Sequence, residues 1–173
     1  FSEDGSVIYI CSFKTDEMLM LDSETLSEVG PRLKFTAGTR PASMTRVPGT
    51  NQVAVVMVGS NNLSRDAYPD SIAFVDLESF AITGSVFPVV DSDSTDISHY
   101  VNFVATTTMA FSPDGKWAAI ADQELSSKAA VPELSNDRVW ILDVENMTFV
   151  DYVFSPGMSC ATYLLPAREE FVT

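Results

Sequence analysis

The sequence has few cysteines, few glycines and prolines, and no long apolar run, and each shortage excludes a class of protein. Two cysteines, Cys11 and Cys160, are too few for a disulfide framework or a clustered zinc site. Whether these two pair with each other stays open. With 8 glycines, 9 prolines and 46% hydrophobic residues, the composition is that of a folded domain with an ordinary core. No apolar run reaches the length of about 18 residues that a transmembrane helix requires.

Basic residues are scarce as well, because 10 lysines and arginines stand against 24 acidic residues and give a formal net charge of -14. Such a charge argues against nucleic acid or an anionic membrane surface as a partner. A cation, a basic protein or a merely solvated acidic surface fits this charge better.

One unit recurs four times, and it consists of an apolar strand end, a tight turn and a second apolar strand. Its copies start 46 to 64 residues apart and are Phe1–Val7, Val47–Val53, Phe111–Trp117 and Leu165–Phe171. In the third copy, an Asp-Gly pair supplies the positive φ that a tight hairpin requires. Asn51 is expected to take the place of that glycine in the second copy. Strand repeats of this period are typical of β-propeller blades.

A second hairpin follows in each complete copy and carries an aspartate at its turn. Asp22, Asp76 and Asp143 occupy this equivalent position. A carboxylate there accepts hydrogen bonds from backbone amides further along the turn, so we expect these aspartates to stabilise turns rather than to catalyse a reaction. The large apolar residues of the strands are expected to pack between adjacent blades, and they are Met18, Met20, Phe74, Trp117 and Trp140.

Two of these segments resemble known propeller repeats. Phe111–Trp117 and Val139–Phe149 are similar to blades of the seven-bladed propellers called YVTN or WD40-like, and Glu170–Thr173 resembles the start of a YVTN strand. The resemblance covers nearly the whole chain, although the Gly-His and Trp-Asp dipeptides of true WD40 repeats are absent. It implies a fold shared by lactone hydrolases, quinoprotein-like proteins and surface-layer proteins. It supplies no catalytic motif that could be carried over to this chain.

The sequence therefore predicts an all-β fold of four-stranded antiparallel β-propeller blades. About three and a half blades are expected, in segments at 1–43, 44–107, 108–160 and 161–173. A closed ring takes about 4 to 8 blades, and an open arc would expose apolar strand edges. We therefore expect the chain to be part of a seven-bladed propeller whose remaining blades lie outside it. The alternative is that two copies of the chain close one ring.

The excess length of the chain gathers in one set of connections. These connections join the two middle strands of a blade or join successive blades, and they are 30–42, 59–70, 88–108 and 122–137. Both kinds lie on one face of a propeller, and binding residues tend to lie on loops held by a rigid scaffold. We expect the functional surface on this face. Its candidate binding residues are Arg40, Arg65, Tyr68, His99 and Tyr100.

The longest connection carries three carboxylates within six residues, Asp91, Asp93 and Asp96, close to the only histidine. Clustered oxygen ligands suit calcium, although the segment lacks the glycine and the terminal glutamate of an EF-hand loop. Calcium is thus a candidate ligand, and a merely solvated acidic loop is the alternative. Two sequons make Asn62 and Asn146 candidate glycosylation sites and favour a secreted, periplasmic or lumenal protein.

The repeats specify a scaffold more closely than a reaction, because propellers carry enzymes and binding surfaces alike. The first hypothesis is a binding or structural module that presents its long loops to a protein or glycan partner. The alternative is an enzyme of the lactonase or quinoprotein type, with polar residues converging at the mouth of the central channel. A third interpretation is a calcium-stabilised extracellular repeat. The catalytic residues of any enzyme activity are left unknown.

Overall fold

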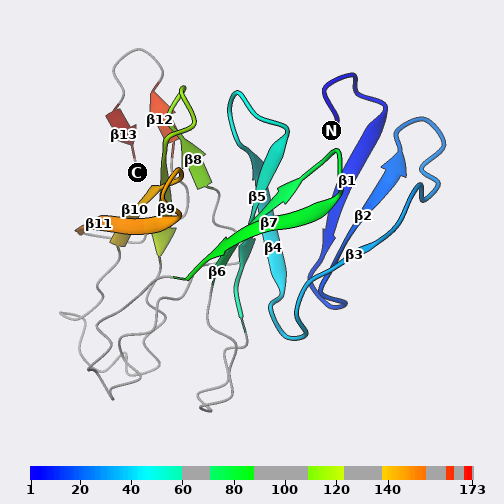
Figure 1. Ribbon diagram of the computed structural model, residues 1–173, viewed down its shortest axis with the longest axis horizontal. Helices are drawn as coiled ribbons and strands as arrows, with labels where there is room; N and C mark the ends of the chain where they lie inside the picture. Colours follow the sequence, from blue (N-terminus) through cyan, green and yellow to red (C-terminus); the bar gives the residue numbers. More distant parts are fainter. Residues whose placement is uncertain (60–70, 88–108, 123–137, 155–162, 166–169, 173) are drawn as a thin grey trace.

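The computed structural model describes residues 1–59, 71–87, 109–122, 138–154, 163–165 and 170–172. Every regular element in these ranges is a β-strand, and the strands form four antiparallel sheets (Figure 1). The prediction of an all-β fold is confirmed. These ranges contain no helix long and apolar enough to cross a membrane.

Each sheet collects strands that follow one another in the sequence. The first sheet contains β1 (Val7–Ser12), β2 (Glu17–Asp22) and β3 (Leu33–Lys34). The second contains β4 (Pro41–Arg46), β5 (Gln52–Met57), β6 (Ser71–Asp76) and β7 (Ala81–Val86). The third contains β8 (Met109–Phe111), β9 (Trp117–Asp122), β10 (Arg138–Asp143) and β11 (Thr148–Phe154). The fourth contains β12 (Tyr163–Leu165) and β13 (Glu170–Val172).

The sheets follow one another in space in the order of the sequence. β4 contacts both β1 and β8, and β8 contacts β12, so strands of successive sheets are neighbours along one side (Figure 1). The second and third sheets have four antiparallel strands each, as expected of propeller blades. The blade boundaries, the seven-bladed ring and the ring of two copies stay predictions.

The second sheet is buried on both faces. Val56 and Phe74 lie in a core shared with Ile120 of the third sheet. Val55, which points to the opposite face of the same strand as Val56, lies in a core shared with Met18 of the first sheet. Because both faces of the sheet are covered, β5 and β6 carry continuous apolar runs instead of alternating apolar and polar residues.

Of the five aromatic and methionine residues expected between the blades, three are buried, one is half-buried and one is exposed. Met18, Phe74 and Trp140 are buried, and Met20 packs against the core between the first two sheets. Trp117 is 41% exposed, so the expectation is wrong for this residue. Trp117 is the first residue of β9 and pairs with the turn residue Asp143, which leaves the indole at the end of the sheet.

Two different turns close the first hairpins of the second and third sheets. At Ser112–Gly115, the amide of Gly115 donates to the carbonyl of Ser112 (2.9 Å), and Gly115 has a φ of 71°. At Val47–Thr50, proline precedes Gly49, whose φ is 70°, as in a type II turn. The expectation that Asn51 takes the left-handed conformation is therefore wrong, because the Pro-Gly pair turns the chain two residues earlier.

The second hairpins confirm the structural role of their aspartates. Asp22 Oδ1 accepts from the amides of Glu24 (3.1 Å) and Thr25 (2.7 Å). Asp76 Oδ1 accepts from the amide of Ser79 (2.7 Å), and Asp143 Oδ1 accepts from that of Asn146 (2.9 Å). The same turn ends each time on an apolar residue with positive φ, and these residues are Leu26, Phe80 and Met147.

The register places the predicted long connections 59–70, 88–108 and 122–137 at one end of the second and third sheets. In the second sheet, Met57 pairs with both Pro41 and Ser71, so residues 58–70 leave from the end at which β4 begins. Val86 pairs with Ile72, so the connection after β7 leaves from that end too. In the third sheet the same end carries Asp122 and Arg138, which pair with each other. We call this the long-loop end and the opposite end, which carries the hairpins described above, the tight-turn end. The predicted connection 30–42 is not a single connection, because it contains β3 and because residues 30–32 belong to the connection 23–32, which leaves β2 from the Asp22 end.

Candidate functional site

The first sheet supplies a described part of the long-loop end. There the turn 13–16 joins β1 to β2, and residues 35–40 join β3 to β4. The equivalent connections of the second and third sheets lie mainly outside the described residues. The two short connections therefore carry the geometry of the site.

Asp16 ties the two connections together. Its Oδ1 accepts from the backbone amide of Arg40 (2.6 Å), and its Oδ2 accepts from that of Gly38 (2.8 Å). Its own carbonyl accepts from the amide of Phe35 (2.8 Å). A carboxylate that receives two backbone amides forms charge-assisted hydrogen bonds, which are stronger than neutral ones. The turn 13–16 therefore fixes the conformation of residues 35–40.

Arg40 has a strained backbone. Its φ is 51°, in the left-handed region, where a residue other than glycine is disfavoured by about 1–2 kcal/mol. The following residue, Pro41, favours an extended conformation for the residue before it, which adds to the strain. The amide of Arg40 donates to Asp16, and the carbonyl of Arg40 accepts from the amide of Val58 (3.2 Å); these two hydrogen bonds hold the conformation. Strain of this kind concentrates at functional sites.

The side chain of Arg40 lies over an exposed aromatic ring. The guanidinium carbon is 5.7 Å from the ring centroid of Phe13, which is a cation–π contact. Phe13 is 43% exposed, and Arg40 is half-buried. The pair thus places a partly exposed aromatic ring and a guanidinium group in contact at the long-loop end.

Arg40 also differs from the other arginines whose side chains the structure describes. Arg32 forms ion pairs with Glu17 and Glu28, and Arg46 lies 3.8 Å from Glu3. Among the described residues, no carboxylate lies within ion-pair distance of the Arg40 guanidinium. In a chain with a net charge of -14, a half-buried arginine without a carboxylate partner in this part of the chain is a candidate anion-binding group.

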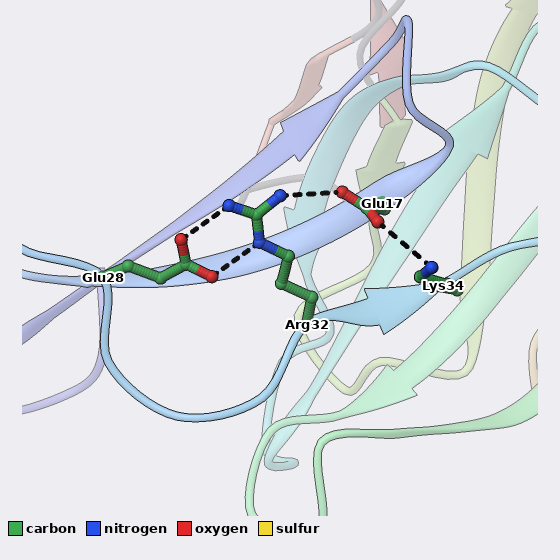
Figure 2. Close-up of polar contacts among 4 residues, drawn as sticks. All are labelled: Glu17, Glu28, Arg32 and Lys34. Carbon is green, nitrogen blue, oxygen red and sulfur yellow. Dashed lines mark hydrogen bonds and ion pairs between the residues drawn. The ribbon is translucent and has the colours of Figure 1, made fainter.

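The charges near β3 are engaged with one another (Figure 2). Arg32 Nη1 donates to the buried Glu17 (3.1 Å), and its Nε and Nη2 donate to the two oxygens of Glu28 (2.6 and 2.7 Å). Lys34 Nζ lies 3.8 Å from the other oxygen of Glu17. Hydrogen bonds to Glu28 and then to Glu17 raise the pKa of Arg32, and the same contact with Arg32 lowers the pKa of Glu28. This network attaches the two-residue strand β3 to β2 and is structural.

Of the predicted binding residues, the structure describes Arg40 and places it at the long-loop end. The other predicted binding, metal and glycosylation residues on the long connections lie outside the described residues, and these are Arg65, Tyr68, His99, Tyr100, Asp91, Asp93, Asp96 and Asn62. Their roles stay predictions.

Asn146 lies in the exposed turn between β10 and β11, at the tight-turn end. Its backbone amide and its Nδ2 both donate to the carboxylate of Asp143, each at 2.9 Å. Glycosylation of Asn146 stays a prediction. The sugar would be attached to Nδ2, the nitrogen that donates to Asp143.

Cys11 and the acidic groups offer no metal site in the described ranges. Cys11 packs against the core between the first two sheets. Burial raises the pKa of its thiol to about 12, so the thiol is unreactive. Cys160 lies outside the described residues, so the question of their pairing stays open. No group of three or more histidine, cysteine, aspartate or glutamate side chains in the described ranges could hold a metal ion.

The sequence indicated Arg40 but missed its two partners. Phe13 and Asp16 are distant from Arg40 in the sequence, and Asp16 is 24 residues away from it. A four-residue turn at the position of a long connection was the available signal, because it forces residues 13–16 against the start of β4.

Comparisons with known proteins support the fold. No known protein-family model and no curated protein sequence matches the chain. A candidate 6-phosphogluconolactonase from Bacteroides uniformis has a TM-score of 0.66 at 15% identity, over 99% of this chain and 44% of that one. The WD40 domain of Pan2 from Neurospora crassa has a TM-score of 0.58 at 12% identity, over 94% of this chain and 40% of that one.

The dihydro-heme d1 dehydrogenase NirN has a TM-score of 0.60 at 12% identity, over 99% of this chain and 30% of that one. The chain therefore spans less than half the length of each of these structures. At such identities the similarity establishes the fold and not the activity. The chain folds as blades of a β-propeller.

Proposed function

We propose that the protein is a propeller-type binding module of the YVTN or WD40-like kind, which presents its long-loop end to a protein or glycan partner. The observation that carries the proposal is the contrast between the two ends of the blades. At the long-loop end, Asp16 fixes a half-buried Arg40 against the exposed Phe13. Rigid scaffolds that hold adaptable loops are the usual basis of binding surfaces.

The tight-turn end uses its polar groups within its own turns. Asp114 Oδ1 accepts from the hydroxyl of Ser112 (2.7 Å) and from the amide of Lys116 (3.1 Å), and both contacts lower the pKa of Asp114. Asp4 makes the same contacts with Ser2 and Ser6 in the first copy of the turn. Carboxylates that are satisfied in this way stabilise the hairpins and are poorly placed to bind a partner.

One surface at the tight-turn end competes with this proposal. A shallow hollow there is lined by Glu3 and by residues 46–51. Its arginine, Arg46, already lies 3.8 Å from Glu3. Because this cation has an acidic neighbour, the hollow offers a weaker electrostatic anchor than the long-loop end.

Two exposed lysines allow the proposal to be tested. Lys14 lies in the turn 13–16 at the long-loop end, and Lys116 lies in the turn between β8 and β9 at the tight-turn end. A photoreactive amino acid is placed at one position or the other in the intact protein, which is then irradiated in extract from its source. We expect a discrete cross-linked product from position 14 and none from position 116, and digestion with protease or glycosidase identifies the partner class. A product from position 116 alone would contradict the proposal.

A further inference from the structure

We infer that Arg40 and Phe13 form the anchor for a single carboxylate group, carried by a neutral or basic peptide segment of a protein partner. This inference rests on the proposed function, because it names the kind of partner that the long-loop end binds. It is carried by the conformation of Arg40, by its surroundings and by the charge of the chain.

The conformation of Arg40 is fixed before any ligand arrives. The carboxylate of Asp16 accepts hydrogen bonds from the amides of Gly38 and Arg40, and the amide of Val58 donates to the carbonyl of Arg40. The buried Thr39 donates its hydroxyl to the carbonyl of Thr36 (2.8 Å) and completes the loop. A hydrogen-bonded loop that holds an arginine in a left-handed conformation makes Asp16 a positioning residue for the guanidinium group.

The guanidinium group retains its capacity for hydrogen bonding. A cation–π contact supplies no oxygen acceptor to the guanidinium, whose five N–H donors form a planar fork. Among the described residues, no hydrogen bond or ion pair engages the side chain of Arg40. A planar fork of donors matches the two oxygens of a carboxylate in a bidentate arrangement.

The surroundings favour a carboxylate over a phosphate and a peptide over an acidic sugar. The chain has a net charge of -14, so a singly charged group meets less repulsion than a doubly charged phosphate. A sugar ring usually needs a free aromatic face, and Arg40 occupies one face of Phe13. A partly exposed phenylalanine beside an arginine is instead typical of protein interfaces, in which aromatic residues and arginine are enriched. A neutral or basic sequence around the carboxylate avoids further repulsion.

The test titrates two peptides into the purified protein and follows the Nε–Hε signal of Arg40 by nuclear magnetic resonance. The peptides are N-acetyl-Leu-Glu-Phe-Lys amide and its twin with glutamine in place of glutamate. We expect the glutamate peptide to shift the Arg40 signal and to bind about tenfold more tightly than its twin, since the glutamine peptide cannot form the charged pair. Equal binding of the two peptides would overturn the inference.

Variants supply the second arm. Arg40→Lys keeps the charge and removes the planar fork, so we expect the affinity for the glutamate peptide to fall about fivefold or more. Arg46→Lys at the tight-turn end is the matched control and should leave the affinity unchanged. Unchanged binding by Arg40→Lys, with a normal unfolding midpoint, would contradict a bidentate anchor.

Two further probes separate the ligand classes. Inorganic phosphate and methyl glucuronide are titrated under the same conditions, and tighter binding of either one than of the glutamate peptide would overturn the assignment to a peptide carboxylate. The outcome is distinguishable from failure of the proposed function. If position 14 cross-links to a partner but the two peptides bind equally, the protein is still a binding module and only the carboxylate anchor is rejected. If position 116 alone forms a cross-link, the proposed function itself is rejected.

Discussion

The contact between the second and third sheets at the tight-turn end can be tested at a single glycine. A Cβ added to Gly115 would lie 2.7 Å from the carbonyl oxygen of Pro48, which is a backbone atom in the neighbouring blade. Gly49, in the facing turn, has nearly the same φ, and a Cβ there meets nothing within 4 Å. The two glycines therefore share a backbone requirement and differ in their contact with the adjacent blade.

Replacement by alanine should separate these two effects. Gly49→Ala places a Cβ in the left-handed region and should lower the free energy of unfolding by about 1–2 kcal/mol. Gly115→Ala has the same conformational effect and also forces the two turns apart, and overpacking of this kind costs about 1–3 kcal/mol. We therefore expect Gly115→Ala to destabilise the protein by about 2–5 kcal/mol in all.

Urea unfolding of the wild type and both variants, followed by tryptophan fluorescence, measures the difference. The slope of free energy against urea concentration should stay the same, since neither variant changes the surface that unfolding exposes. Equal destabilisation by the two substitutions would refute the packing of the 47–51 turn against Gly115, and with it the stacking of these two blades.

Three further predictions concern the turns and the core. Leu26 and Phe80 both have positive φ, but Leu26 is 63% exposed and Phe80 only 8%. Leu26→Gly relieves the backbone strain and should raise the free energy of unfolding by about 0.5–1 kcal/mol. Phe80→Gly also removes a buried ring and should lower the free energy of unfolding by about 3–5 kcal/mol, and urea unfolding measures both changes. Hydrogen bonds from Ser2 and Ser6 lower the pKa of Asp4 to about 2, and the pKa of Asp22, Asp76, Asp114 and Asp143 is lowered as well. Because the pKa values are lower in the folded protein than in the unfolded chain, the ionised aspartates stabilise the fold above the unfolded pKa of about 4, and this stabilisation is lost as the pH falls towards 2. The melting temperature should therefore decline between about pH 4 and pH 2, and Asp114→Asn should make the decline shallower. Burial raises the pKa of Cys11 to about 12, so in a Cys160→Ser variant the Cys11 thiol should react with a disulfide reagent at pH 8 only after urea is added, and rapid reaction of the native protein would contradict its burial.

The fold was predictable because it depends on short-range patterns. The Asp-Gly pairs at 4–5 and 114–115 carry the positive φ of their hairpins, as the sequence indicated. The aspartates at the second hairpins bind the amides that follow them within three residues. Interactions of this range are encoded locally, so a repeated pattern predicts a repeated structure.

The errors have physical reasons as well. Asn51 can adopt the left-handed conformation, but Pro48 and Gly49 form the turn instead, and Asn51 is not among the described residues with positive φ. Trp117 follows the same apolar pattern as the buried aromatic residues, and its exposure depends on its place at the end of β9. Neither outcome can be derived from residue type without the register of the strands.

The candidate site was predictable only in part. The lengths of the connections indicated that Arg40 lies at the long-loop end, because the order of the strands determines at which end of a sheet each connection lies. The contacts of Arg40 with Phe13 and Asp16 depend on how β1 packs beside β4. Such contacts between distant segments are set by the tertiary structure and leave no pattern in the sequence.

Hydrogen–deuterium exchange with the partner cross-linked from position 14 tests most directly whether the long-loop end is the functional surface. The purified protein is compared with and without that partner. We predict slower exchange at the amides of residues 13–16 and 35–40, and unchanged exchange in the turns 47–51 and 112–116. Protection confined to 47–51 and 112–116 would contradict binding at the long-loop end and would place the partner on the opposite face of the blades.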